Sequence, residues 1–417
     1  MSPRDTPTDT PPASLAGSAS QPPGRAALPR PPIWLLVAMI AIGPFTMQVL
    51  VPSLPAMGQD LGASIATIQL TVTLYLVAVG AGQLIYGPLS DRFGRRPLLM
   101  GGLALYAVAS LAAALAPGVG WLIVARIFQA VGACAGVVLA RAVIRDVWPR
   151  DESASVLGYV TMGMTVSPMF APIIGSLLEM AFGWRATMLA CLVFAAPVAL
   201  VCWARLPETL PAPQPLPGVV AILRAYRSLW AIPSFRTYSA VTACTTGVFF
   251  AFLGGAPYVV VQGMGYSPLT FALAFASISI AFALGNWIAG HYSVRLGVMR
   301  VLSVGVFINA GGALLAAAVV LVFPPHILDF ILPMAVVAVG NGMTQPTSIA
   351  GALSARPQLA GTASALVGAM QMVFGALMTF VVGLVEFGAG LGTSLTMAAA
   401  GIGAYLALRG ARRAARA

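Results

Sequence analysis

The sequence predicts an all-α membrane protein in which twelve transmembrane helices form two pseudo-symmetric bundles of six. Three observations predict this fold: an apolar composition, the number of apolar segments and an internal repeat. The 417 residues are 59% hydrophobic and 8% charged, whereas soluble domains carry about 25% charged residues. A net charge of +11 would suggest nucleic acid as the partner of a soluble protein. In so apolar a chain we expect no nucleic-acid partner, and the predicted surrounding is the lipid bilayer.

Apolar segments of membrane-spanning length, about 20 residues each, recur along the whole chain. Twelve segments qualify: 34–56, 67–89, 98–116, 121–143, 154–181, 186–204, 237–261, 268–290, 300–323, 327–350, 360–386 and 390–408. The longest polar interruption divides six segments from six. The predicted domains are a disordered cytoplasmic tail (1–33), a six-helix bundle (34–205), a cytoplasmic linker (206–236), a second six-helix bundle (237–408) and a basic cytoplasmic tail (409–417).

The arginines predict the orientation, because Lys and Arg accumulate in cytoplasmic loops. With the N-terminus inside, strict alternation across twelve spans places all basic residues on the cytoplasmic side except Arg126 and Arg185. One miscounted span would destroy this pattern. We therefore expect both termini to be cytoplasmic.

An internal repeat supports a two-half architecture. Gly87, Arg92 and Gly94 after the second span recur as Gly290, Arg295 and Gly297 after the eighth, at one constant offset. Two similar halves with a site between them are a known plan of secondary transporters. No polar insertion is large enough for a catalytic domain, so the chain is predicted not to be an enzyme.

Several motifs carry a family resemblance over roughly residues 34–408. They are Gly87-Pro88-Leu89-Ser90-Asp91-Arg92-Phe93-Gly94-Arg95-Arg96-Pro97, the stretch Arg126 to Ala133, Ala171 to Gly175, Pro207-Glu208-Thr209, Val138 to Asp146 and Gly361 to Leu366. The first closely resembles the loop signature of the major facilitator superfamily. Together they resemble twelve-span drug:proton antiporters of the Bcr/CflA subfamily. The resemblance implies the major facilitator fold and a bacterial inner-membrane exporter of drugs or small amphipathic molecules, by alternating access and in exchange for protons. We expect a monomer, because one chain carries both halves.

The resemblance also implies a cytoplasmic gate. The gating loop is Gly87, Asp91, Arg92, Gly94, Arg95 and Arg96, and its expected partners are Arg141, Arg145, Gly361 and Thr362. Asp91 would bridge to these partners when the cytoplasmic side is closed. Arg95 and Arg96 are interpreted as serving orientation and contact with anionic lipid.

Arg126, about six residues into the fourth span, is costly in a bilayer. In the resembled antiporters this arginine belongs to proton coupling, and the alternative is snorkelling to the outer headgroups. Gln129 lies in the same motif, and Gln48 stands where relatives often carry an acid in the first span. An amide opposite an arginine leaves a positive site, which predicts a preference for neutral or anionic compounds and puts proton coupling in question.

Two further groups are candidates in the spans. Pro168, Pro172 and Gly175 are expected to kink and close-pack the fifth span, and the resemblance assigns them to the outer seal. Asn341, Gln345 and Gln371 are candidate substrate contacts, with interhelical hydrogen bonding as the alternative.

Other chemistry finds no support in the sequence. The four cysteines and two histidines lack metal spacing, and no phosphate-binding loop of the form GxxxxGK[ST] occurs. We expect no metal, no cofactor and no ATP-driven step. The other functions considered are a metabolite exporter of the same fold, for nucleobases or amino-acid derivatives, a lipid-acting membrane enzyme and a transporter-derived sensor.

Overall fold

The computed structural model describes residues 29–414 apart from 211, 213, 214, 216, 217, 324, 325 and 387–389. The predicted tail at 1–33 therefore lies outside the described residues up to position 28, and residues 415–417 lie outside as well. Within the described part of the chain every regular element is helical.

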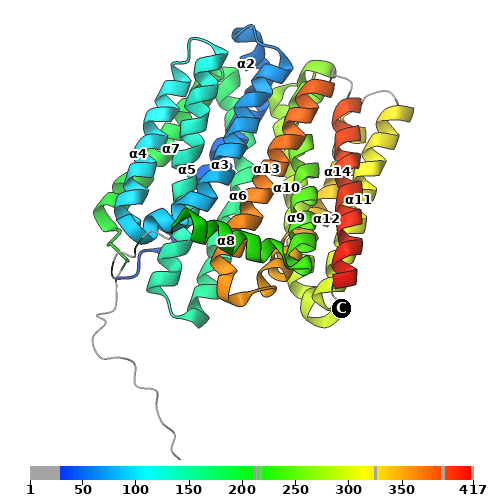
Figure 1. The fold of residues 1–417 in the computed structure, drawn as a ribbon. Coiled ribbons are helices and arrows are strands. Elements are labelled where there is room, and N and C mark those ends of the chain that lie inside the picture. The colour runs from blue at the N-terminus through cyan, green and yellow to red at the C-terminus, as the bar shows by residue number, and fades with distance from the viewer. Residues whose placement is uncertain are drawn as a thin grey trace, which may run out of the picture.

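Long helices run side by side in two groups (Figure 1). The N-terminal group comprises α1 (Ile33–Leu50), α2 (Leu54–Asp60), α3 (Ile65–Phe93), α4 (Arg95–Ala114), α5 (Val119–Val147), α6 (Arg150–Phe182) and α7 (Arg185–Arg205). The C-terminal group comprises α9 (Pro233–Pro257), α10 (Pro268–Leu296), α11 (Val298–Val322), α12 (Ile327–Ser354), α13 (Ala360–Val385) and α14 (Leu391–Ala414). Between them the short helix α8 (Val219–Trp230) lies across the ends of the long helices (Figure 1). Two short 3-10 turns, Val51–Ser53 and Pro357–Leu359, precede α2 and α13. One wider π-helical turn, Tyr258–Gly263, follows α9.

Eleven described helices, with α1 and α2 taken as one, are long and apolar enough to cross a membrane. The helix α6 adds a shorter apolar stretch, Val166–Phe182. The chain is thus a multi-pass membrane protein. The expected basic tail differs from the structure at its start, because α14 continues through Arg409 to Ala414.

The internal repeat appears in the backbone. Gly94 separates α3 from α4 with φ of 96°, and Gly297 separates α10 from α11 with φ of 82°. Residues with a Cβ rarely adopt such angles, whereas glycine does so at little cost. The repeated glycines therefore encode the same sharp reversal between two helices in each half.

The buried apolar residues show where the halves meet. One cluster joins both halves near α2 and the start of α3, with Leu54 and Ile68 from the N-terminal half and Phe252 and Phe271 from the C-terminal half. At the opposite end, a cluster around Ile144 belongs to the N-terminal half alone and one around Leu229 belongs to α8 and the C-terminal half. If the termini are cytoplasmic, the shared cluster closes the outer end.

Candidate functional site

The gating loop builds an ion-pair network around Arg95. This side chain is 7% exposed, and its guanidinium contacts Asp91 at 2.6 Å and Asp146 of α5 at 2.9 Å. Ser90 also accepts a hydrogen bond from it. Thr209 donates to the same Asp146 carboxylate at 3.2 Å. Arg95 therefore contacts protein carboxylates rather than lipid headgroups, unlike its expected role.

The motif that follows α7 is part of the same network. Glu208 accepts the backbone N–H groups of Arg95 at 2.9 Å and Arg96 at 3.1 Å, the first residues of α4. An anion is favourable there because the N-terminal end of a helix carries unpaired N–H groups and a partial positive charge. A Cβ on Gly94 would lie 2.6 Å from the Glu208 carboxylate. Glu208 can therefore bind the two N–H groups in this position only because residue 94 is a glycine.

The expected gate partners are brought together in part. A Cβ on Gly361, at the start of α13, would lie 3.3 Å from the Arg145 guanidinium, so Arg145 of α5 reaches the other half. Asp91 pairs with Arg95 in its own loop instead. Arg92 is exposed at the end of α3.

Arg126 is completely buried inside the N-terminal half. It donates to Gln129, which in turn donates to Ser110 of α4 at 2.7 Å, and its guanidinium stacks over the Tyr75 ring with a centroid distance of 4.2 Å. Its Nε and one terminal nitrogen have no hydrogen-bond partner. The hydrogen bonds of Arg126 thus go to Gln129 and not to Gln48. Snorkelling to the outer headgroups does not describe a side chain that is 0% exposed.

Gln48 is 4% exposed, and its side-chain oxygen has no hydrogen-bond partner. An unsatisfied buried polar atom costs about 1–3 kcal/mol. Gln48 therefore places an unsatisfied polar atom near the C-terminal end of α1.

The amides of the C-terminal half form one interhelical cluster. Gln345 of α12 and Gln371 of α13 both donate to Thr246 of α9, at 2.8 and 3.1 Å. Gln371 also donates to the Gln345 side-chain oxygen at 2.8 Å. Asn341 is buried with an unpartnered side-chain oxygen. The expected interhelical bonding is present for Gln345 and Gln371, and their partial exposure leaves them able to contact a ligand.

The C-terminal part of α6 packs against the end of α1 and the start of α10. A Cβ on Gly175 would lie 2.0 Å from the Val49 carbonyl oxygen, so α1 and α6 touch backbone to backbone. Ser176 donates to the Pro268 carbonyl of α10 at 3.0 Å, which ties the two halves together. Pro168 and Pro172 lie inside α6. The helices α1, α6 and α10 are therefore in direct contact at this end of the molecule.

Sequence reasoning missed one carboxylate at this contact between α1, α6 and α10. Glu179, one turn beyond Gly175, lies beside the Ser53 hydroxyl, and its Oε2 is buried without a hydrogen-bond partner. The only sequence signal was an acid near the end of a span, which is an ordinary place for one.

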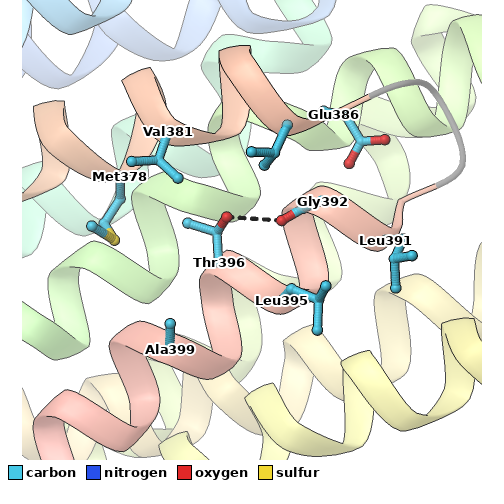
Figure 2. A pocket seen from close by; sticks show the side chains of 9 residues that line it. Met378, Val381, Glu386, Leu391, Gly392, Leu395, Thr396 and Ala399 are labelled. Carbon is cyan, nitrogen blue, oxygen red and sulfur yellow. Dashed lines mark hydrogen bonds between the residues drawn. The ribbon is translucent and has the colours of Figure 1, made fainter.

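Glu386 has a structural role at the opposite half. It is 3% exposed, and its two oxygens accept the backbone N–H groups of Gly390 at 3.0 Å and Thr393 at 2.8 Å, at the start of α14. Figure 2 shows it at one end of an apolar groove of about 520 Å³ between α13 and α14, in which Thr396 donates to Gly392. Glu386 thus stabilises the start of a helix.

These observations define a helical membrane protein of two packed halves, with buried polar groups in the spans and a charged loop between α3 and α4. The chain belongs to the Major Facilitator Superfamily, whose pattern it matches over residues 33–379. It is 34% identical to the chloramphenicol resistance protein of Pseudomonas aeruginosa, over 80% of each chain. It is 31% identical to multidrug resistance protein D of Escherichia coli strain K12, over 81% of this chain and 85% of the relative.

Solved structures agree with the fold. A bacterial homologue of the human lysosomal transporter Spinster, in an inward-facing and unoccupied conformation, superposes with a TM-score of 0.71 at 17% identity, covering 92% of this chain and 96% of that one. The relatives confirm the resemblance to Bcr/CflA-type drug exporters.

Proposed function

We propose that the chain exports neutral, hydrogen-bonding drugs from the bacterial cytoplasm by alternating access, in exchange for protons. The observation that carries the neutral preference is the isolation of Arg126. Its polar contacts are Gln129 and the Tyr75 ring, and two of its donors are unpartnered. A lipophilic cation would be repelled by such a charge at low dielectric. Resistance proteins among the relatives, one of them against chloramphenicol, support this class of substrate.

The proposal includes the architecture. The apolar part of α6 is the twelfth membrane span beside the eleven longer ones. The two six-helix bundles are residues 34–205 and 237–408, and residues 206–236 link them. Both termini are cytoplasmic in the inner membrane, the chain acts as a monomer, and the chain is not an enzyme. The cytoplasmic gate closes when the outer side opens, and it consists of the gating loop with Arg141, Arg145, Gly361 and Thr362. In that state Asp91 leaves Arg95 and contacts these partners.

The test is accumulation of chloramphenicol and of ethidium, an organic cation, in an efflux-deficient bacterium that expresses the chain, with and without collapse of the proton gradient. We expect low chloramphenicol accumulation that rises on collapse. Arg126→Gln should reduce chloramphenicol export at least tenfold. Arg185→Gln, which removes an exposed outer arginine paired with Asp60, should change it less than twofold.

Two outcomes contradict the proposal. Stronger export of ethidium than of chloramphenicol would overturn the neutral preference. Accumulation equal to that of the empty vector would favour a metabolite exporter of the same fold. Membrane levels of each variant are compared by immunoblot, so that a variant that fails to insert is recognised.

A further inference from the structure

We infer that Glu179 is the proton-binding carboxylate of this transporter and that its protonation holds the outer seal closed. The inference rests on the proposed proton-coupled export. It supplies the acid that Gln48 does not provide in the first span.

Glu179 differs from every other carboxylate whose side chain the structure describes. Four of those side chains pair with arginines: Asp60, Asp91, Asp146 and Glu152. Glu208 and Glu386 accept N–H groups at helix starts, and Asp329 lies in the first turn of α12. Glu179 instead lies in the last turn of α6, where the helix dipole is unfavourable to an anion.

The surroundings of Glu179 supply no counter-charge. Residues 33–53 of the first span and its following turn contain no titratable group, and neither does the outer part of α10, residues 268–290. Arg185 at the start of α7 contacts Asp60 at 2.6 Å. Transfer of a carboxylate into such a site is costly unless it is neutral. The closed seal therefore accommodates the protonated acid.

The position of Glu179 links its charge to the movement of the halves. The register of α1 against α6 places Gly175 at Val49 and Glu179 beside Ser53. Ser176, three residues before Glu179, bonds to α10 of the other half. Loss of the proton would leave a charge within this contact, and separation of α6 from α10 would let water solvate it. Ionisation thus favours the outward-open state.

Two buried oxygens of the same span have no hydrogen-bond partner, those of Ser53 and Gln48. Ser53 lies beside Glu179. The proton that Glu179 takes up from outside is released to the inside after the outer seal has closed. The proton count balances, since Glu179 gains one proton from outside and releases the same proton inside for each cycle.

The first test measures the seal itself and needs no drug. Spin labels at Gln59→Cys and Gln262→Cys, exposed outer positions in the two halves, report the distance between the outer ends in nanodiscs. The chain without these two cysteines controls for labelling of its native ones. We expect the short distance to gain population as the pH falls. Glu179→Gln, a neutral isostere, should give at every pH the mixture of short and long distances that the chain with Glu179 gives at low pH. Asp60→Asn should respond to pH as the chain with Asp60 does.

The second test separates coupling from transport. In proteoliposomes, Glu179→Gln should keep exchange of labelled chloramphenicol across the membrane within about threefold and lose at least tenfold of the uptake driven by a pH gradient. Gln48→Glu added to Glu179→Gln tests whether an acid in the first span restores driven uptake. A pH-dependent distance that persists in Glu179→Gln, or driven uptake that persists, would overturn the inference. Absence of chloramphenicol exchange in all variants, with the distance changes as expected, would instead overturn the proposed substrate.

Discussion

The two halves make the same turn between helices, but different side chains surround it. In the N-terminal half, the reversal at Gly94 is surrounded by Asp91, Arg95, Asp146 and Glu208, which compensate one another. In the C-terminal half, the reversal at Gly297 has the same backbone conformation but no carboxylate, because the only acids after residue 208 are Asp329 and Glu386. These lie at the start of α12 and at the end of α13. A positive-φ glycine alone makes the turn. The ion network is present in one half only, and it joins the loop before α4, helix α5 and the segment after α7.

Among substitutions that test this difference between the halves, Arg95→Ala is expected to lower the stability of the protein most. Loss of one partner of a buried ion pair costs about 3–5 kcal/mol, and the partial exposure of Asp91 and Asp146 reduces this to about 2–3 kcal/mol. The purified protein in detergent should therefore unfold at a temperature several degrees lower, as followed by a thiol-reactive dye on the buried cysteines.

The matched control is Arg300→Ala, an exposed arginine at the end of the second copy of the loop. Its free energy of unfolding should stay within about half a kcal/mol of that of the unaltered chain, so its unfolding temperature should hardly change. Equal losses for the two variants would show that the network around Arg95 adds nothing to stability.

A smaller effect is expected for Glu208→Gln. The amide keeps one oxygen that can accept an N–H group of α4 but loses the charge–dipole attraction, worth about 0.3–1 kcal/mol at a helix start. Glu152→Gln, which breaks an exposed pair with Arg30, serves as the control and should cost less, because exposed pairs contribute about 0–1 kcal/mol. Thermal unfolding at low and high salt distinguishes the two, and an identical salt dependence would contradict a specific role for Glu208.

The sequence was sufficient to predict a helical, multi-pass membrane protein of this family, because the apolar composition and the loop motifs are local properties of the chain. The contacts of a buried side chain are not local, because they depend on residues that are distant in the sequence. The Arg95 side chain was expected to contact lipid, but its guanidinium pairs with Asp146 of α5, and its backbone N–H is bound by Glu208 from the segment after α7. Both partners are distant from Arg95 in the sequence. Likewise Gln345 and Gln371 were recognised as polar residues in apolar helices, but their shared contact with Thr246 depends on how three helices pack. Glu179 was missed for the same reason, since its isolation is a property of α1, α6 and α10 together.

The smallest effect belongs to an attempt to build the missing pair. Val294 is 91% exposed, and Val294 and Val298 flank Gly297 as Asp91 and Arg95 flank Gly94. Val294→Asp alone places an anion in the last turn of α10 and should destabilise slightly. Val294→Asp with Val298→Arg should recover about 0.3–0.5 kcal/mol of coupling, the usual value for an exposed pair four residues apart, as measured by a double-mutant cycle of thermal unfolding. A coupling above about 2 kcal/mol would mean that the turn geometry by itself makes a strong ion pair. The small value would show instead that Asp146 and Glu208, supplied from elsewhere in the chain, give the N-terminal loop its strength.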